Sequence, residues 1–246
     1  MLENVQIYNV LFIDLETVSG KSSYSELPPR LQEHWSKKAQ FVDRSLAGTD
    51  LDDEMIAKLY QERAAIYAEF GKIVCISIGY IHRTTREFRM KSFASHDEKA
   101  LLEEFIELVS RYFYDADEHM ICGHNIREFD IPYLCRRLVV HGLMLPPILS
   151  LAGKKPWETM HLVDTMQLWK FGDFKNFTSL DLLAAVLDID TPKDDIDGSM
   201  VGRVYWEDRD LERIAKYCEK DVLTVAQVLL KMKGVDPIQA EKVVTV

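Results

Sequence analysis

The sequence lacks the features of a membrane-spanning, secreted or zinc-binding protein. No apolar run reaches the roughly 18 residues that a membrane span needs. The apolar stretch from Val5 to Leu15 contains Asp14 and follows no basic segment, so we do not expect a signal peptide. The four cysteines form no CxxC pair and lie within apolar segments. This pattern indicates reduced core thiols in a cytoplasmic protein.

Basic charge is also scarce. The 246 residues include 40 acidic and 30 basic side chains, which gives a net charge of −10. This balance argues against a protein that coats a nucleic-acid backbone with a basic face. It leaves open an enzyme that holds a short length of strand through metal ions.

The pattern of apolar residues predicts one α/β domain over residues 1–246, because the chain has no repeat and no long linker. The predicted strands are Val5–Leu15, Lys72–Ile81, Arg86–Phe93 and Met120–Gly123. The predicted helices are most of 27–70, a helix that Asp97 caps, Ile131–His141, Leu180–Leu187 and Asp208–Met232. This order favours a mixed central sheet flanked by helices.

Two carboxylates lie near the end of the first predicted strand. Side chains alternate along a strand, so Asp14 and Glu16 point the same way, about 6.7 Å apart. Such a pair is repulsive unless a cation lies between the two groups. Either the pair binds a cation, or Asp14 only ends the strand and Glu16 is solvated.

A second acidic motif, Asn125-Ile-Arg-Glu-Phe129-Asp130, follows the short strand at Met120–Gly123. Asp130 stands at a helix start with Pro132 in the first turn, which favours a plain N-cap. The loop is also at the carboxyl end of a strand, where α/β sheets bind ligands.

A third motif lies in the last predicted helix, where Tyr217 and Asp221 are four residues apart and share one face. Asp221 lies about 60° from the centre of the buried stripe. A carboxylate at the edge of a core needs a partner. A salt bridge would require a basic residue from a distant segment.

The order of these three motifs resembles the DEDD exonuclease superfamily, in its tyrosine branch. The second motif is most similar to the 3′–5′ proofreading exonuclease domain of family-B DNA polymerases. The resemblance extends to Leu162-Val-Asp164-Thr and to Phe177-Thr-Ser-Leu-Asp181. It implies a ribonuclease H-like (DnaQ-like) fold in a free-standing exonuclease without a polymerase domain. About fifty residues between Thr17 and the next strand indicate a mainly helical insertion at about 21–70.

The resemblance also implies what the site residues do. Asp14, Glu16, Asp130 and Asp221 would bind two divalent cations, Mg²⁺ or Mn²⁺, since carboxylate oxygens suit hard cations. Tyr217 would orient the attacking water and complete the catalytic set. The main chain of Leu15 to Thr17, with Asn125 and Phe129, would contact the terminal nucleotide. The implied reaction releases nucleoside monophosphates from a 3′ end, with single-stranded DNA favoured over RNA.

Two alternatives keep the same fold: an exoribonuclease that acts on RNA, and an inactive nucleic-acid-binding module. An aspartyl phosphatase of the haloacid dehalogenase type fits less well. That chemistry uses a second aspartate where this chain has Glu16, and it gives no reason for Tyr217 and Asp221.

Several residues outside the motifs have weaker assignments. Asp164 and Asp181 are expected to support the site or to cap helices, and His124 is expected to be structural. The segment His34–Phe41 interleaves aromatic and basic residues. It is either a helix that packs its aromatics into the core or a surface that stacks on single-stranded bases. The candidate phosphate contacts are Arg136, Arg137, Lys154, Lys155, Lys170 and Lys175.

Overall fold

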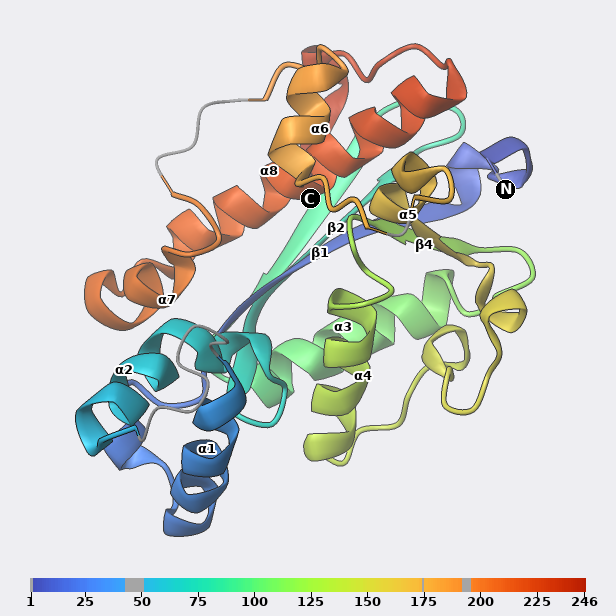
Figure 1. Cartoon of the computed structure of the whole chain (residues 1–246). Helices are drawn as coiled ribbons and strands as arrows, with labels where there is room; N and C mark the ends of the chain where they lie inside the picture. The colour runs from blue at the N-terminus through green and yellow to red at the C-terminus, as the bar shows by residue number, and fades with distance from the viewer. Residues whose placement is uncertain (1, 43–50, 174, 192–195) are drawn as a thin grey trace.

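A mixed six-stranded sheet lies at the centre of the fold (Figure 1). The computed structural model describes residues 2–42, 51–173, 175–191 and 196–246. The strands are β1 (Val10–Ser19), β2 (Gly71–Ile81), β3 (Phe88–Ala94), β4 (Met120–Gly123), β5 (Leu162–Asp164) and β6 (Val243–Thr245). Their order is β5-β4-β1-β2-β3-β6, and β1 pairs antiparallel with β2 and parallel with β4. The predicted mixed α/β sheet is confirmed.

The first strand begins and ends later than the sequence predicts. Residues Ile7–Asn9 form a 3-10 turn, whereas pairing with the start of β2 extends β1 to Ser19. Asp14 and Glu16 therefore lie inside the strand rather than at its end. The short edge strands β5 and β6 escape prediction because three residues are too few for a periodic pattern.

Helices cover both faces of the sheet (Figure 1). Helices α3 (Glu98–Tyr112) and α4 (Asp130–Val140) bury Leu11, Ile13 and Leu15 of β1 on one face. Helix α8 (Leu211–Lys233), with α5 (Thr165–Lys170) and α6 (Leu180–Val186), covers Phe12 on the other face. Because side chains alternate along a strand, Asp14 and Glu16 point toward the α8 layer.

In the described part of the segment between β1 and β2, the α-helices are α1 (Pro29–Val42) and α2 (Asp53–Arg63), which share a small core. Residues 43–50 of the predicted insertion lie outside the described residues. Trp35 is fully buried in that core and donates a hydrogen bond to the carbonyl of Ile56. Of the two alternatives for His34–Phe41, packing into a core is therefore correct for Trp35. Phe41 is 82% exposed.

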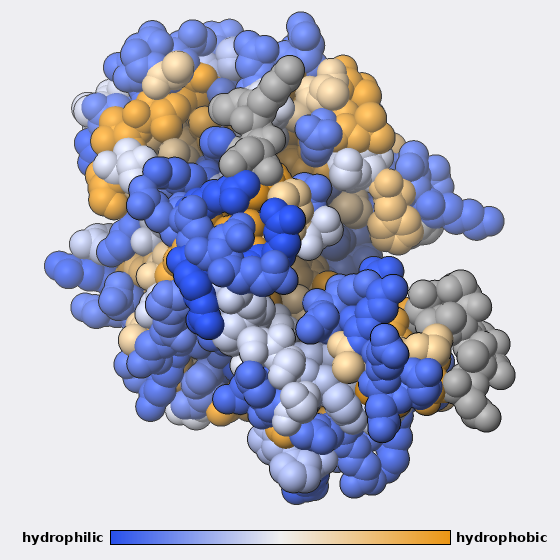
Figure 2. Space-filling model, turned by 90° about the vertical axis from the view of Figure 1, so that its left-hand side faces the viewer, coloured by the Kyte–Doolittle hydropathy of each residue, from blue (hydrophilic) through white to orange (hydrophobic). Residues whose placement is uncertain are grey.

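The end of the molecule that carries α2 and α7 (Val201–Arg203) is mainly hydrophilic, with smaller hydrophobic patches (Figure 2). A π-helical turn at Val204–Asp208 joins α7 to α8. Short 3-10 segments occur at Leu2–Asn4, Tyr24–Glu26, Ala64–Ile66, Pro147–Leu149, Pro156–Thr159 and Ala240–Lys242. Within the described ranges, no helix combines the length and apolar character that a bilayer crossing requires.

Candidate active site

The free edge of β1 forms the base of the candidate active site. On one side of the strand, Asp14 pairs with Ser77 and Glu16 pairs with Cys75 of β2. On the other side, the ladder with β4 ends at Phe12. The β1 edge beside Asp14 and Glu16 is therefore open to the loop that follows β4.

Asp130 approaches this edge from the start of α4 and is only 4% exposed. Its carboxylate accepts hydrogen bonds from its own backbone N–H and from that of Leu15. The plain N-cap interpretation is wrong, because Phe129 is the cap residue and Asp130 is already helical. The bond to Leu15 places Asp130 directly against β1.

Helix α8 supplies Tyr217 and Asp221 from consecutive turns, and their side chains are hydrogen-bonded to each other. The buried thiol of Cys218 lies beneath them and donates to the Asp14 backbone carbonyl and to Asp14 Oδ2, each at 3.4 Å. Ligand atoms of Asp14, Glu16 and Cys218 lie within 4.8 Å of one another. Asp14 and Cys218, which are 204 positions apart in the sequence, are thus in direct contact.

Burial and mutual repulsion control the charge of this acidic cluster. The pKa values of Asp14 and Glu16 are raised well above their ordinary values, first by burial and then by neighbouring carboxylates. Burial likewise raises the pKa of Asp130 to about 7. Asp221 contributes to all three shifts through its negative charge, which shows that the four predicted acids face one another.

The donor set of the cluster fits a hard divalent cation. Among the described residues, no basic side chain forms an ion pair with Asp14, Glu16 or Asp130. Clustered carboxylate oxygens are the ligands that Mg²⁺ and Mn²⁺ prefer. Burial raises the pKa of the Cys218 thiol, so this group stays a neutral donor to Asp14. The residues present therefore fit a hard cation better than a thiolate-bound zinc ion.

Three of the predicted nucleotide-contacting residues, Leu15, Thr17 and Phe129, are chain neighbours of the acids. The Leu15 side chain is buried in the α3–α4 core, which leaves only its main chain near the site. A β-bulge separates Glu16 from Thr17. Phe129 packs against Tyr133, with ring centroids 5.5 Å apart.

Asn125 has the most unusual conformation in the loop after β4. Its φ of +63° lies in the left-handed region, which L-residues adopt rarely and often at functional sites. Its side-chain Oδ1 is buried and accepts no hydrogen bond from the described residues. An acceptor in this state suits a hydrogen bond to a ligand.

Supporting residues hold that loop in place. Asp164 caps α5 and accepts hydrogen bonds from the backbone N–H groups of Asn125 and Arg127, so its predicted capping role is confirmed. His124 bonds to the Thr165 hydroxyl and the Thr178 carbonyl, which is the structural role expected for it. The prediction for Asp181 as a cap is wrong, because Ser179 caps α6.

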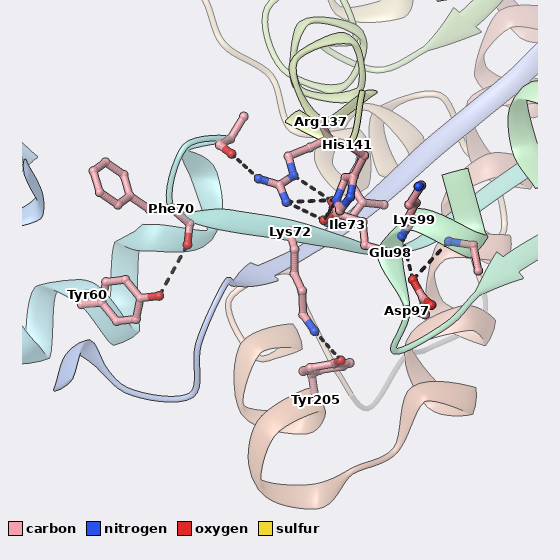
Figure 3. Close-up of polar contacts among 12 residues, drawn as sticks. Tyr60, Phe70, Lys72, Ile73, Asp97, Glu98, Lys99, Arg137, His141 and Tyr205 are labelled. Carbon is pink, nitrogen blue, oxygen red and sulfur yellow. Dashed lines mark hydrogen bonds and ion pairs between the residues drawn. The ribbon is translucent and has the colours of Figure 1, made fainter. Parts of the chain in front are cut away.

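Two residues have roles that the sequence does not reveal. Cys218 belongs to the buried stripe of α8, and its bond to Asp14 depends on tertiary packing. Arg137, a predicted phosphate contact, instead forms a buried ion pair with Glu98, so that prediction is wrong (Figure 3).

Comparisons with known proteins agree with this arrangement. Residues 66–241 match a protein family described as "Predicted 3'-5' exonuclease related to the exonuclease domain of PolB". That range contains Asp130, Tyr217 and Asp221, while Asp14 and Glu16 precede it. No curated protein matches the chain.

Among solved structures, the chain is similar to the family B DNA polymerase from the hyperthermophilic archaeon Pyrobaculum calidifontis. The TM-score is 0.51 and the sequence identity is 18%, so the similarity concerns the fold. It covers 90% of this chain and 24% of the polymerase chain. The chain thus spans about a quarter of that polymerase, and the predicted ribonuclease H-like fold is confirmed.

Proposed function

Because the chain belongs to the family of predicted 3'-5' exonucleases related to the exonuclease domain of PolB, we propose that it removes nucleotides from the 3′ end of single-stranded DNA. The proposed reaction hydrolyses one phosphodiester bond at a time and releases nucleoside monophosphates. The observation that carries this proposal is the convergence of four carboxylates from β1, α4 and α8.

Asp14, Glu16, Asp130 and Asp221 would hold two divalent cations, Mg²⁺ or Mn²⁺. When bound, such a pair of ions activates water and stabilises the leaving oxygen of a phosphodiester. Burial and neighbouring carboxylates raise the pKa of Tyr217 above its ordinary value. Its hydroxyl therefore stays protonated and serves to orient the attacking water rather than to act as a base.

The terminal nucleotide would lie between β1 and the start of α4. The main chain at Leu15 and Thr17 would face the 3′-terminal sugar, and Phe129 would pack against it. The Asn125 Oδ1 atom, which accepts no bond from the described residues, is available to a donor on the nucleotide. These contacts require a free 3′ end.

We further propose that residues 1–246 act as one exonuclease domain in which about 21–70 is an insertion. Gly20, which directly follows β1, donates its N–H to the Phe70 carbonyl at the end of the insertion, and inside the insertion the Lys21 N–H donates to the Tyr60 hydroxyl. We also propose that this segment is a lid that grips the frayed end of the strand.

Digestion of end-labelled oligonucleotides tests the proposal. We expect a ladder from free 3′ ends of single-stranded DNA that requires Mg²⁺ or Mn²⁺ and disappears with a 3′ block. Matched RNA strands test substrate choice in the same assay. No cleavage of any strand by wild-type protein with either metal would contradict the proposed function.

A further inference from the structure

The connection between α5 and α6 carries aromatic side chains and a buried lysine, and it is hydrogen-bonded to the loop that follows β4. It runs from Trp169 and Lys170, at the end of α5, to Phe177, just before the buried Thr178. Phe174 lies outside the described residues. Figure 1 shows this connection on the same side of the sheet as α8.

Hydrogen bonds fix the connection to the active-site loop. His124 Nε2 bonds to the Thr178 carbonyl at 2.9 Å, and His124 Nδ1 bonds to the Thr165 hydroxyl at 2.9 Å. His124 directly precedes Asn125. On the other side, Leu168 and Leu180 pack in the same core cluster as Val222, the neighbour of Asp221. The connection therefore adjoins both Asn125 and the acidic helix α8.

Among the described residues of this connection, the rings of Phe171 and Phe177 are open to solvent. Phe171 is 83% exposed and Phe177 is 65% exposed. The backbone of Phe171 has a φ of +44°, a left-handed conformation that strains a bulky residue. The ring of Trp169 supports Phe171 from one side, at 6.4 Å between centroids. Two exposed aromatic rings on one short connection suit a surface that a ligand covers.

Lys170 is a buried cation in the same place. It is only 8% exposed, and its ammonium lies 4.2 Å from the centroid of the Phe177 ring. Among the described residues, no carboxylate forms an ion pair with it. A buried charge without a counter-charge is unfavourable, so the site suits an anion from outside the chain.

We propose that Lys170, Phe171 and Phe177 form a strand-binding platform, on which Lys170 contacts a phosphate and the two rings stack on bases upstream of the scissile bond. This inference rests on the proposed exonuclease function and adds a site to it. Base stacking on aromatic rings combined with a nearby cation is how proteins hold single strands without sequence preference.

A single nucleic-acid strand fits these features better than a protein partner does. The platform is continuous with the loop that carries Asn125, through the His124 bond to Thr178. Lys170 supplies a charge complementary to phosphate inside a chain of net charge −10.

The first test measures how much the two rings contribute to binding of a strand. The platform variants are Phe171→Ala, Phe177→Ala and the double variant, and the control is Tyr112→Ala. Tyr112 is an exposed ring at the end of α3, on the opposite face of the sheet, and the Arg111 guanidinium lies 5.2 Å from its centroid. We expect each platform variant to raise KM for a ten-nucleotide strand roughly tenfold, with kcat unchanged. Activity on a small chromogenic phosphodiester of thymidine monophosphate should stay at the wild-type level, and Phe171→Trp should keep wild-type KM.

The second test measures how much the charge of Lys170 contributes to binding of a strand. Lys170→Gln is compared with Lys91→Gln, whose ammonium also lies over a phenylalanine ring, 4.7 Å from the Phe93 centroid. Loss of one phosphate contact should reduce the slope of log Kd for single strands against log salt concentration by about 0.7. Binding is measured by fluorescence anisotropy of labelled decathymidylate in chelator, so it does not depend on hydrolysis.

The outcomes separate this inference from the proposed function. Wild-type KM and Kd in the platform variants would overturn the platform, as would equal losses on the ten-nucleotide strand and the small ester. A change in oligomeric state with unchanged strand affinity would assign the rings to a protein interface. A wild-type protein that binds decathymidylate through the platform but cleaves no strand would overturn the proposed function alone.

Discussion

Carboxylates on the two faces of the sheet have their charge compensated in different ways. On the α3–α4 face, Glu98 is 6% exposed and is fully compensated (Figure 3). Its two oxygens accept bonds from the Ile73 N–H, from the Arg137 guanidinium and from His141. On the α8 face, Asp14 and Glu16 meet Asp130 and Asp221 instead of a basic residue.

The difference shows how to separate a structural acid from a metal-binding one. A buried carboxylate needs compensation. Where the chain supplies an arginine, as for Glu98, the compensation is permanent and the role is to join α3, α4 and β2. Where the described residues offer Asp14, Glu16 and Asp130 no basic partner, protons or cations from solvent must compensate the charge. The acidic cluster therefore has the electrostatics of an ion-binding site.

The largest expected effect comes from removing a carboxylate from the cluster. Asp14→Asn should lower the rate of hydrolysis by more than about 10⁴-fold, beyond the usual loss of an orienting group. Asp236→Asn, which removes an exposed acid just after α8, is the matched control and should keep wild-type activity. The rates of hydrolysis of end-labelled strands by the two variants and the wild type test this prediction. Substantial activity in Asp14→Asn would place the chemistry elsewhere.

Tyr217→Phe should cause a smaller loss, of about 10²–10⁴ in kcat, because it removes an orienting hydroxyl and leaves the carboxylates. Manganese affinity, measured by calorimetry, should barely change, whereas Asp221→Asn should weaken it clearly. Wild-type kcat in Tyr217→Phe would show that the ring only packs beside Asp221.

Breaking the compensated pair should affect stability and leave metal binding intact. Arg137→Met leaves Glu98 buried without its main partner and should destabilise the fold by about 3–5 kcal/mol. The double variant Glu98→Gln/Arg137→Met should recover part of this loss. Urea denaturation measures both. If Arg137→Met instead abolishes the stabilisation by manganese, the two carboxylate groups are not independent.

The smallest expected effect is on the pH dependence of stability without metal. The folded pKa of Asp130 is about 7, above its ordinary value, and those of Asp14 and Glu16 are also raised. From about pH 4 to about pH 7 the folded state thus binds more protons than the unfolded state, so stability falls as pH rises. Melting temperatures in chelator should show this fall, and Asp130→Asn should flatten it. An equal slope in both proteins would contradict the assignment.

Much of the site is predictable from the sequence because it depends on short-range periodicity. Alternation along a strand places Asp14 and Glu16 on one side, and helical spacing places Tyr217 beside Asp221. The order of the motifs then indicates the family. These relations need no knowledge of tertiary contacts.

The remaining features depend on contacts between distant segments. Arg137 meets Glu98 across 39 residues, so its sequence context cannot distinguish an ion pair from a phosphate contact. The aromatic and basic residues of His34–Phe41 and of 169–177 look alike in sequence. Yet Trp35 is buried in a core, and Phe171 is exposed to solvent.

Thermal melting with and without manganese tests the central claim, that the acidic cluster binds divalent cations, most directly. In chelator, Asp14→Asn should melt higher than wild type because it removes one of four repelling carboxylates. Added Mn²⁺ should raise the melting temperature of the wild type more than that of the variant. A variant that melts lower in chelator, with equal manganese shifts in both proteins, would contradict the account.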